Sequence, residues 1–111
     1  MSELSRLGKI AKKILDEKML KLIKTIRDKK EKTEALKYSL SSHLELMYFD
    51  IEKKVKEMEN QKKDVFFALA KLNRLHPKLK IFKAEYKEED IHKFLKLYSE
   101  IEKELENVRV I

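Results

Sequence analysis

The chain has 111 residues, a formal net charge of +7 and a charged fraction of 42%. A single Gly and a single Pro exclude most β architectures, which need these residues at their turns, and the lack of Cys excludes disulfides, thiolate metal ligands and cysteine nucleophiles. Hydrophobic residues make up another 42%, which is too high for a disordered polyelectrolyte. We therefore expect one all-α domain that covers residues 1–111.

The first predicted helix covers about residues 2–28. Its apolar residues, from Leu4 to Ile26, recur at steps of three and four, which is the period of one helix face. Ser2 followed by Glu3 predicts an N-cap with an acidic residue in the first turn, where the helix dipole favours negative charge.

Residues 28–34 predict the turn to the next helix, because this charged stretch has nothing apolar to bury, and Thr33 is then the next N-cap. An alternative turn lies at 39–42, where Ser42 and Glu45 have the spacing of a capping box. One helix that runs through both places is a third possibility. We favour the turn at 28–34, since the serines lie within an apolar-rich stretch.

The second predicted helix is long and covers about residues 34–75. It ends at His76–Pro77, because proline disfavours helical geometry in the residue before it. Residues 78–87 partly alternate in polarity and predict a short extended connector or one strand, whose local partner would be residues 108–111. A C-terminal helix is predicted over 88–107, and its three acidic first residues suit the dipole of a helix N-terminus.

The expected architecture is an elongated antiparallel helical hairpin or three-helix bundle with a long central helix. At 1.5 Å per residue the second helix would be about 60 Å long, so one chain can enclose little of it. Its first half is apolar on more than one face and therefore needs cover from another copy. We expect a homodimer held by a coiled-coil-like stripe of five residues: Leu36, Leu40, Leu44, Met47 and Ile51.

No set of residues in the sequence indicates catalysis. Glu89 and His92 have the Glu-x-x-His spacing of di-iron bundles, but those sites need a second such motif and two more glutamates. Ser41 and Ser42 beside His43 do not make a nucleophile set, because hydrolases assemble such groups from separate elements. We expect a non-enzymatic protein with no catalytic residue, no metal site, no cofactor and no small-molecule substrate.

Positive charge is concentrated in residues 1–32 and 61–87, each with a net charge of +6, whereas residues 33–60 and 88–111 carry −2 and −3. In the second basic block the cations are interleaved with aromatic residues, a pattern that suits phosphate contact and base stacking. The predicted nucleic-acid-binding residues are Arg74, Lys78, Lys80, Lys83, Phe82 and Tyr86. The simpler interpretation, with the aromatics in the core and the lysines in solvent, is favoured because phosphate binders usually have denser or more Arg-rich patches.

The sequence indicates neither export nor membrane insertion. Its N-terminus is charged throughout and lacks the apolar core of a signal peptide. The longest stretch without a charged residue, 38–44, is far shorter than a membrane span. We expect an intracellular, soluble, cytoplasmic protein. The many Lys and Glu beside only four Asn and Gln are typical of heat-adapted proteins, although an A/T-rich genome also raises the Lys content.

The function that these patterns predict is association. A self-associating, non-enzymatic helical protein that presents a helical surface to an unidentified protein partner accounts for the long apolar stripes. The alternative is a small basic nucleic-acid-binding protein whose phosphate contacts are largely independent of base sequence. Salt dependence separates the two, because phosphate contacts release counterions and weaken steeply as the salt concentration rises.

Overall fold

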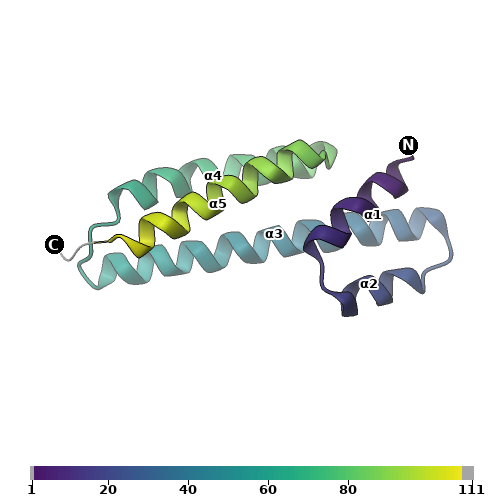
Figure 1. Cartoon of the computed structure of the whole chain (residues 1–111), viewed down its shortest axis with the longest axis horizontal. Coiled ribbons are helices and arrows are strands. Elements are labelled where there is room, and N and C mark those ends of the chain that lie inside the picture. The colour runs from purple at the N-terminus through teal and green to yellow at the C-terminus, as the bar shows by residue number, and fades with distance from the viewer. Residues whose placement is uncertain (1, 109–111) are drawn as a thin grey trace. The chain divides into compact units, whose positions relative to one another are not determined.

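The computed structural model describes residues 2–108, and within this range the chain forms five helices and no strand (Figure 1). The all-α prediction is confirmed, and so is the long helix near the middle of the chain. The predicted strand partner at 108–111 falls, apart from its first residue, outside the described residues. The helices are α1 (Glu3–Ile14), α2 (Glu17–Lys24), α3 (Lys29–Asn60), α4 (Phe66–Glu85) and α5 (Glu88–Glu106).

The chain divides into two compact units whose boundary lies within α3. The first unit runs to Leu44 and contains α1, α2 and the first part of α3. The second unit starts at Glu45 and contains the rest of α3 together with α4 and α5. The expectation of one domain over residues 1–111 stays a prediction.

The first predicted helix is two helices in the structure. Ser2 caps α1 as predicted, and its side chain accepts a hydrogen bond from the N–H three residues on at 3.2 Å. The helix ends because Leu15 has extended backbone angles, and Asp16 then caps α2 by accepting the Met19 N–H at 2.8 Å. The capping carboxylate satisfies a backbone donor that a continuous helix would have bonded internally. The helical spacing of apolar residues continues through this break. A prediction from that spacing alone therefore treated α1 and α2 as one helix.

The favoured turn at 28–34 was wrong for all but its first residue, because residues 29–34 are helical and the turn before α3 covers residues 25–28. The Asp28 carboxylate caps α3 and accepts the Glu31 N–H at 2.9 Å. Thr33 is not the N-cap, because it lies inside the helix and donates its hydroxyl to the carbonyl one turn earlier at 2.8 Å. The alternative turn at 39–42 was wrong, since these residues are helical and belong to α3.

The second predicted helix, 34–75, is interrupted after Asn60. The N–H groups of Lys62 and Lys63 donate to carbonyls of the last turn of α3 at 3.0 and 3.1 Å, which is the hydrogen-bond pattern of a Schellman motif. Lys62 has the left-handed φ of 61° that the motif requires. Glycine usually occupies this position, so a lysine there gave no sign of a helix end.

Helix α4 continues through Pro77 to Glu85, and the predicted extended connector at 78–87 was therefore wrong. Proline costs about 3 kcal/mol in a helix interior, because it removes a backbone donor and crowds the preceding turn. Leu79 and Phe82 lie beyond it at 4% and 0% exposure, and burying two such side chains contributes about 3 to 6 kcal/mol. Packing therefore outweighs the local preference, and Pro77 itself lies on the exposed side of the helix.

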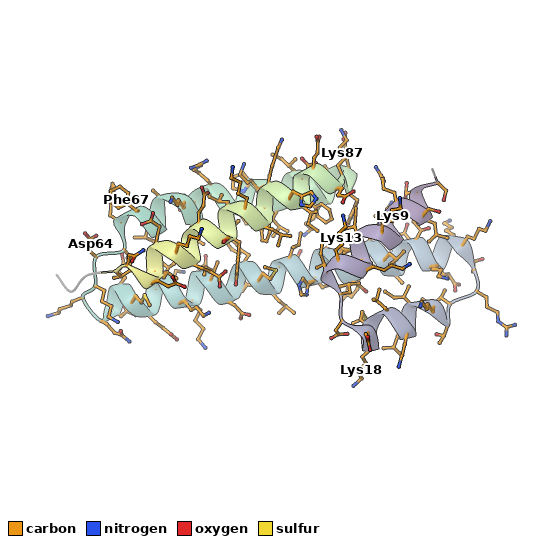
Figure 2. All side chains as sticks on the ribbon, viewed as in Figure 1. Lys9, Lys13, Lys18, Asp64, Phe67 and Lys87 are labelled. Carbon is orange, nitrogen blue, oxygen red and sulfur yellow. The ribbon has the colours of Figure 1, made fainter. Side chains whose placement is uncertain are left out.

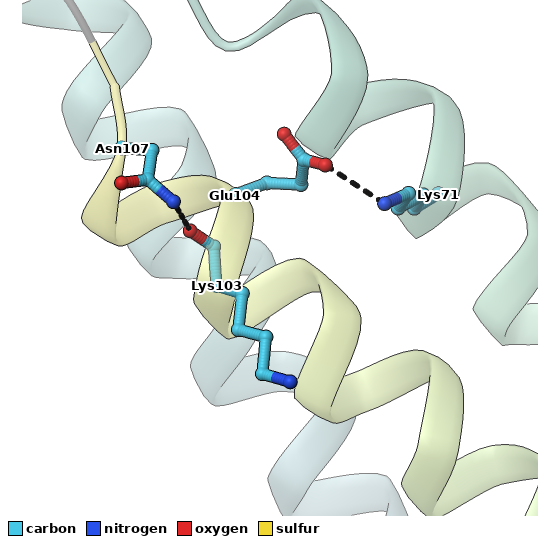
Figure 3. Close-up of polar contacts among 4 residues, drawn as sticks. All are labelled: Lys71, Lys103, Glu104 and Asn107. Atoms are coloured by element: carbon cyan, nitrogen blue, oxygen red, sulfur yellow. Dashed lines mark hydrogen bonds and ion pairs between the residues drawn. The ribbon is translucent and has the colours of Figure 1, made fainter.

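Helices α4 and α5 form an antiparallel hairpin across a short turn at Tyr86 (Figure 1). Tyr86 adopts a left-handed φ of 53° and ends α4 with its N–H on the Phe82 carbonyl. An ion pair between Lys71 Nζ and Glu104 Oε1 at 2.8 Å joins the two helices (Figure 3). The hairpin thus has a defined register, which fixes the side chains that face one another.

Helix α5 matches its prediction of 88–107 to within one residue. Its acidic first turn is present as expected, and Asn107 ends the helix by donating its side-chain amide to the Lys103 carbonyl at 3.0 Å (Figure 3). The helix is strongly amphipathic, so the spacing of its apolar residues was enough to predict its position in the sequence.

Buried side chains form one stripe on each helix of the second unit. Phe82 of α4 and Phe94 of α5 are the largest of them. In the second unit the core includes Ile51, Val55, Leu72, Leu75, Leu79, Phe82, Ile91, Phe94, Leu97 and Ile101. Buried side chains of the first unit include Leu7, Ile10, Ala11, Ile23, Leu36 and Leu40.

Replacing Lys62 by glycine should raise the free energy of unfolding by about 1 kcal/mol, because glycine adopts the left-handed φ without the steric cost of a Cβ. Lys62→Ala is the matched control, since it removes the same side chain but keeps the Cβ. Urea unfolding followed by circular dichroism measures both variants. A glycine variant no more stable than the alanine variant would contradict the Schellman motif at this position.

Candidate functional site

The five residues predicted to mediate self-association lie mainly in the core. Leu36, Leu40, Leu44 and Ile51 are at most 3% exposed, and Met47 is half-buried. Because these side chains are already covered within one chain, self-association through this stripe stays a prediction. The candidate interaction surfaces are therefore formed by the side chains that the fold leaves exposed.

Helix α4 carries exposed apolar side chains on its outer side. Phe66 is 69% exposed and Ile81 is 55% exposed. Phe67, whose ring lies edge-on to that of Phe66, is also largely exposed (Figure 2). Phe66 and Ile81 share one side of the helix with three smaller residues, at successive steps of four, seven, four and three residues. The exposed Asn73 lies on the same side, within the step of seven. We call this set the outer face of α4; its residues are Phe66, Ala70, Pro77, Ile81 and Ala84, all exposed.

Helix α4 is thus apolar on two opposite sides. Its inner side is buried, whereas its outer face lies in solvent within a single chain. A helix that is apolar all round is normally enclosed by other helices. Sequence reasoning missed this face because the predicted helix ended at Pro77, which removed Ile81 and Ala84 from the pattern.

A smaller exposed apolar group lies on α3 within the second unit. Leu46 and Phe49 are exposed, and the Phe49 ring lies edge-on to Tyr48 with centroids 5.7 Å apart. Tyr48 also contacts the His76 ring of α4 at 5.3 Å and donates its hydroxyl to Glu52 at 3.1 Å. Burial, and then the hydrogen bond to the Glu52 carboxylate, raise the pKa of Tyr48, so its hydroxyl stays a donor at neutral pH.

The residues predicted to bind nucleic acid do not form one site. Phe82 is fully buried and contacts the half-buried Tyr86 ring edge-on, so Phe82 cannot stack on a base. Lys83 forms an ion pair with Glu45 of α3. Lys80 follows Arg74 by six residues, and about 240° of helix rotation places it on another side of α4.

Arg74 and Lys78 do come together, and two lysines of α5 join them. The four cations line a groove of about 300 Å³ between α4 and α5, together with Leu97 and Glu100. We call it the basic groove; its cations are Arg74, Lys78, Lys93 and Lys96. Within residues 2–108 none of these four cations forms an ion pair, whereas Lys71 nearby is paired with Glu104.

Lys93 and Lys96 were missed because they belong to the segment 88–111, whose net charge is −3. Of its acidic residues only Glu100 lines the groove, so the net charge of the segment hides the local excess of cations. Their spacing of three residues places them on one helix side. Only the register of the hairpin brings that side next to Arg74.

The Glu-x-x-His pair does not form a metal site in the structure. His92 is exposed, and its Nε2 lies 3.5 Å from Glu88, not Glu89. Among residues 2–108 no three His, Asp or Glu side chains lie close enough to hold a metal ion. No helix within the same range is long and apolar enough to cross a membrane.

Comparison with known proteins adds no functional assignment, since no protein family, curated protein or solved structure matches this chain.

Replacing Leu44 by alanine should lower the free energy of unfolding by about 2 to 5 kcal/mol, because it leaves a cavity at a fully buried site. Leu46→Ala is the matched control two residues away on α3, where the side chain is 63% exposed. It should change stability by about 0.5 kcal/mol or less. Urea unfolding monitored by circular dichroism compares the two variants. Equal losses at both positions would contradict the orientation of α3.

Proposed function

We propose that the protein is a non-enzymatic helical interaction protein that self-associates through the outer face of α4. The observation that supports this proposal most directly is the exposure of Phe66 and Ile81, which lie in register on one side of the helix. Large exposed apolar patches on a protein surface often mark interaction sites, and these two large side chains are the apolar anchors of this face. The homodimer expected from the sequence is thus retained, with a different set of contact residues.

The geometry of the outer face suits a twofold interface. Its residues span positions 66 to 84, a length of about 27 Å along the helix. In a symmetric dimer the same stripe lies on both copies, so Phe66 of one copy can pack near Ala84 of the other. The small residues of the stripe then face the large ones, which allows two helices to approach closely.

Charge beside the outer face opposes this association. Helix α4 carries five basic residues and one acidic residue, so two copies that pair along it repel each other. Salt screens such repulsion between exposed charges. Self-association should therefore strengthen as the salt concentration rises, which is the opposite of the behaviour of phosphate binding.

Sedimentation equilibrium at tens of micromolar protein tests the interface. The wild type should sediment as a dimer, and the double variant Phe66→Ser with Ile81→Ser should be a 13.4 kDa monomer, because each buried apolar side chain contributes about 1.5 to 3 kcal/mol. Leu22→Ser is the matched control, since Leu22 is similarly exposed but lies on α2. A wild type that stays monomeric in both low and high salt would overturn the proposal.

The basic groove supports a second candidate function, which is binding of a nucleic-acid backbone. Four unpaired cations converge from two helices on a groove with one acidic residue, Glu100. Phosphate contacts of this kind position a polyanion without reading its bases. The exposed Phe67 near the start of α4 offers an aromatic ring on the same helix for stacking (Figure 2).

Reversing the charge at Arg74 and Lys93 together should reduce binding of single- or double-stranded nucleic acid at least tenfold in low salt, because two phosphate contacts become repulsive. Lys53→Glu with Lys80→Glu is the control, since it makes the same change in net charge at exposed positions outside the groove. Fluorescence anisotropy at several salt concentrations measures both. If the two double variants lose the same affinity, the groove is not the binding site.

A further inference from the structure

The first unit contains a pocket of about 230 Å³, partly open to solvent, that neither candidate function uses and that we call the cavity. It is lined by residues of α1, α2 and the first part of α3, all of them before Leu44. Four of the lining side chains are aliphatic: Leu4, Leu20, Ile23 and Leu36. A concave, mainly apolar site with a few converging polar groups is the usual form of a small-ligand site.

Three lysines, one from each helix, complete the lining of this cavity. They are Lys12 of α1, Lys24 of α2 and Lys32 of α3. No acidic residue lines the cavity, and within residues 2–108 none of the three lysines forms an ion pair. The site therefore combines an apolar interior with unpaired positive charge, and an anionic group would complement that charge.

Gly8 lines the same cavity and is the only glycine of the chain. It lies in the middle of α1, where glycine is less favourable than alanine. It has no positive φ that would require glycine. Apart from its chain neighbours and the backbone of α1 itself, no atom of the described residues lies within 4 Å of the position that its Cβ would take, so packing does not require glycine either. The consequence of Gly8 is a wider cavity.

We propose that this cavity binds a free anionic amphiphile with a single medium-length apolar tail, such as a fatty-acid carboxylate. The tail lies among the aliphatic side chains, and the carboxylate is held by Lys12, Lys24 and Lys32. The cavity volume of about 230 Å³ exceeds the ~150 Å³ of an apolar cavity known to hold benzene. This proposal does not depend on the outer face of α4 or on the basic groove.

Calorimetric titration of the full chain with octanoate, decanoate and decanol tests the proposal. Below their micelle concentrations the carboxylates should bind with one site per chain, and each added methylene should tighten binding about fourfold until the cavity is full. Decanol has the same tail without the charge and should bind at least tenfold more weakly than decanoate. Absence of saturable decanoate binding at millimolar concentration, or equal binding of decanol, overturns the proposal.

Variants locate the site. Lys12→Gln with Lys24→Gln should weaken decanoate binding at least tenfold, whereas Lys9→Gln with Lys21→Gln, at exposed positions of the same two helices, should not. Gly8→Leu should abolish binding by filling the cavity. Gly8→Ala should raise the melting temperature by about 2–8 °C and weaken binding, which keeps the test valid if the leucine variant fails to fold. Equal losses in both lysine pairs, or unchanged binding in Gly8→Ala and Gly8→Leu, overturn the assignment.

A vesicle-binding experiment distinguishes a site for a free amphiphile from a site that binds the surface of a membrane. The protein is mixed with sedimentable vesicles that contain an anionic phospholipid, with and without the Lys12→Gln, Lys24→Gln pair. The proposal expects the double variant to co-sediment as the wild type does, since a free amphiphile and not a bilayer occupies the cavity. Vesicle binding that depends on this lysine pair, without decanoate binding, overturns it in favour of a lipid-surface site.

Discussion

The packing of α4 on α5 is the constraint on which the surfaces of the second unit depend. Leu75, Leu79 and Phe82 are buried along the inner side of α4, and their burial keeps the chain helical on both sides of Pro77. Without this packing, residues 78–85 would lose the helical period that aligns Pro77 with Ile81. The outer face of α4 and the basic groove would then not exist, because both are assembled from residues four apart.

Contacts of α4 with α5 and with α3 decide which of its cations remain unpaired. Lys71 is held by Glu104 and Lys83 by Glu45, so two of the five basic residues of α4 are neutralised by neighbouring helices. Arg74 and Lys78 lie between them and meet lysines of α5 instead. The net charge of a segment therefore describes the potential of this surface poorly, since pairing across helices removes some charges and convergence concentrates others.

The outer face and the basic groove lie on adjoining sides of α4, so the two proposed functions are compatible in one molecule. A dimer formed through the outer face would carry two basic grooves, and two linked sites on one polyanion bind more tightly than a single site. The cavity of the first unit depends on a different set of helices and a different set of lysines. The two basic blocks of the sequence thus contribute to two separate surfaces.

Much of the fold followed from the order of apolar residues. A helical period is local, so it located α5 to within one residue and predicted Ser2 as the first N-cap. The helix ends were less predictable, because Asp16 and Asp28 are two of 20 acidic residues and only the packing of the flanking helices selects them as caps. Lys62 occupies the left-handed position after the end of α3, where a glycine would have indicated the helix end in the sequence.

The candidate surfaces required the tertiary structure. By itself the sequence determined an all-α protein with amphipathic helices and two basic blocks, because these properties depend on composition and period alone. Which side of a helix is covered depends on the neighbouring helices. The apolar period of one helix does not indicate which helices pack against it. Leu44 and Leu46 lie two residues apart on α3, yet one is 0% and the other 63% exposed, since only the packed structure decides which side of that helix meets the core.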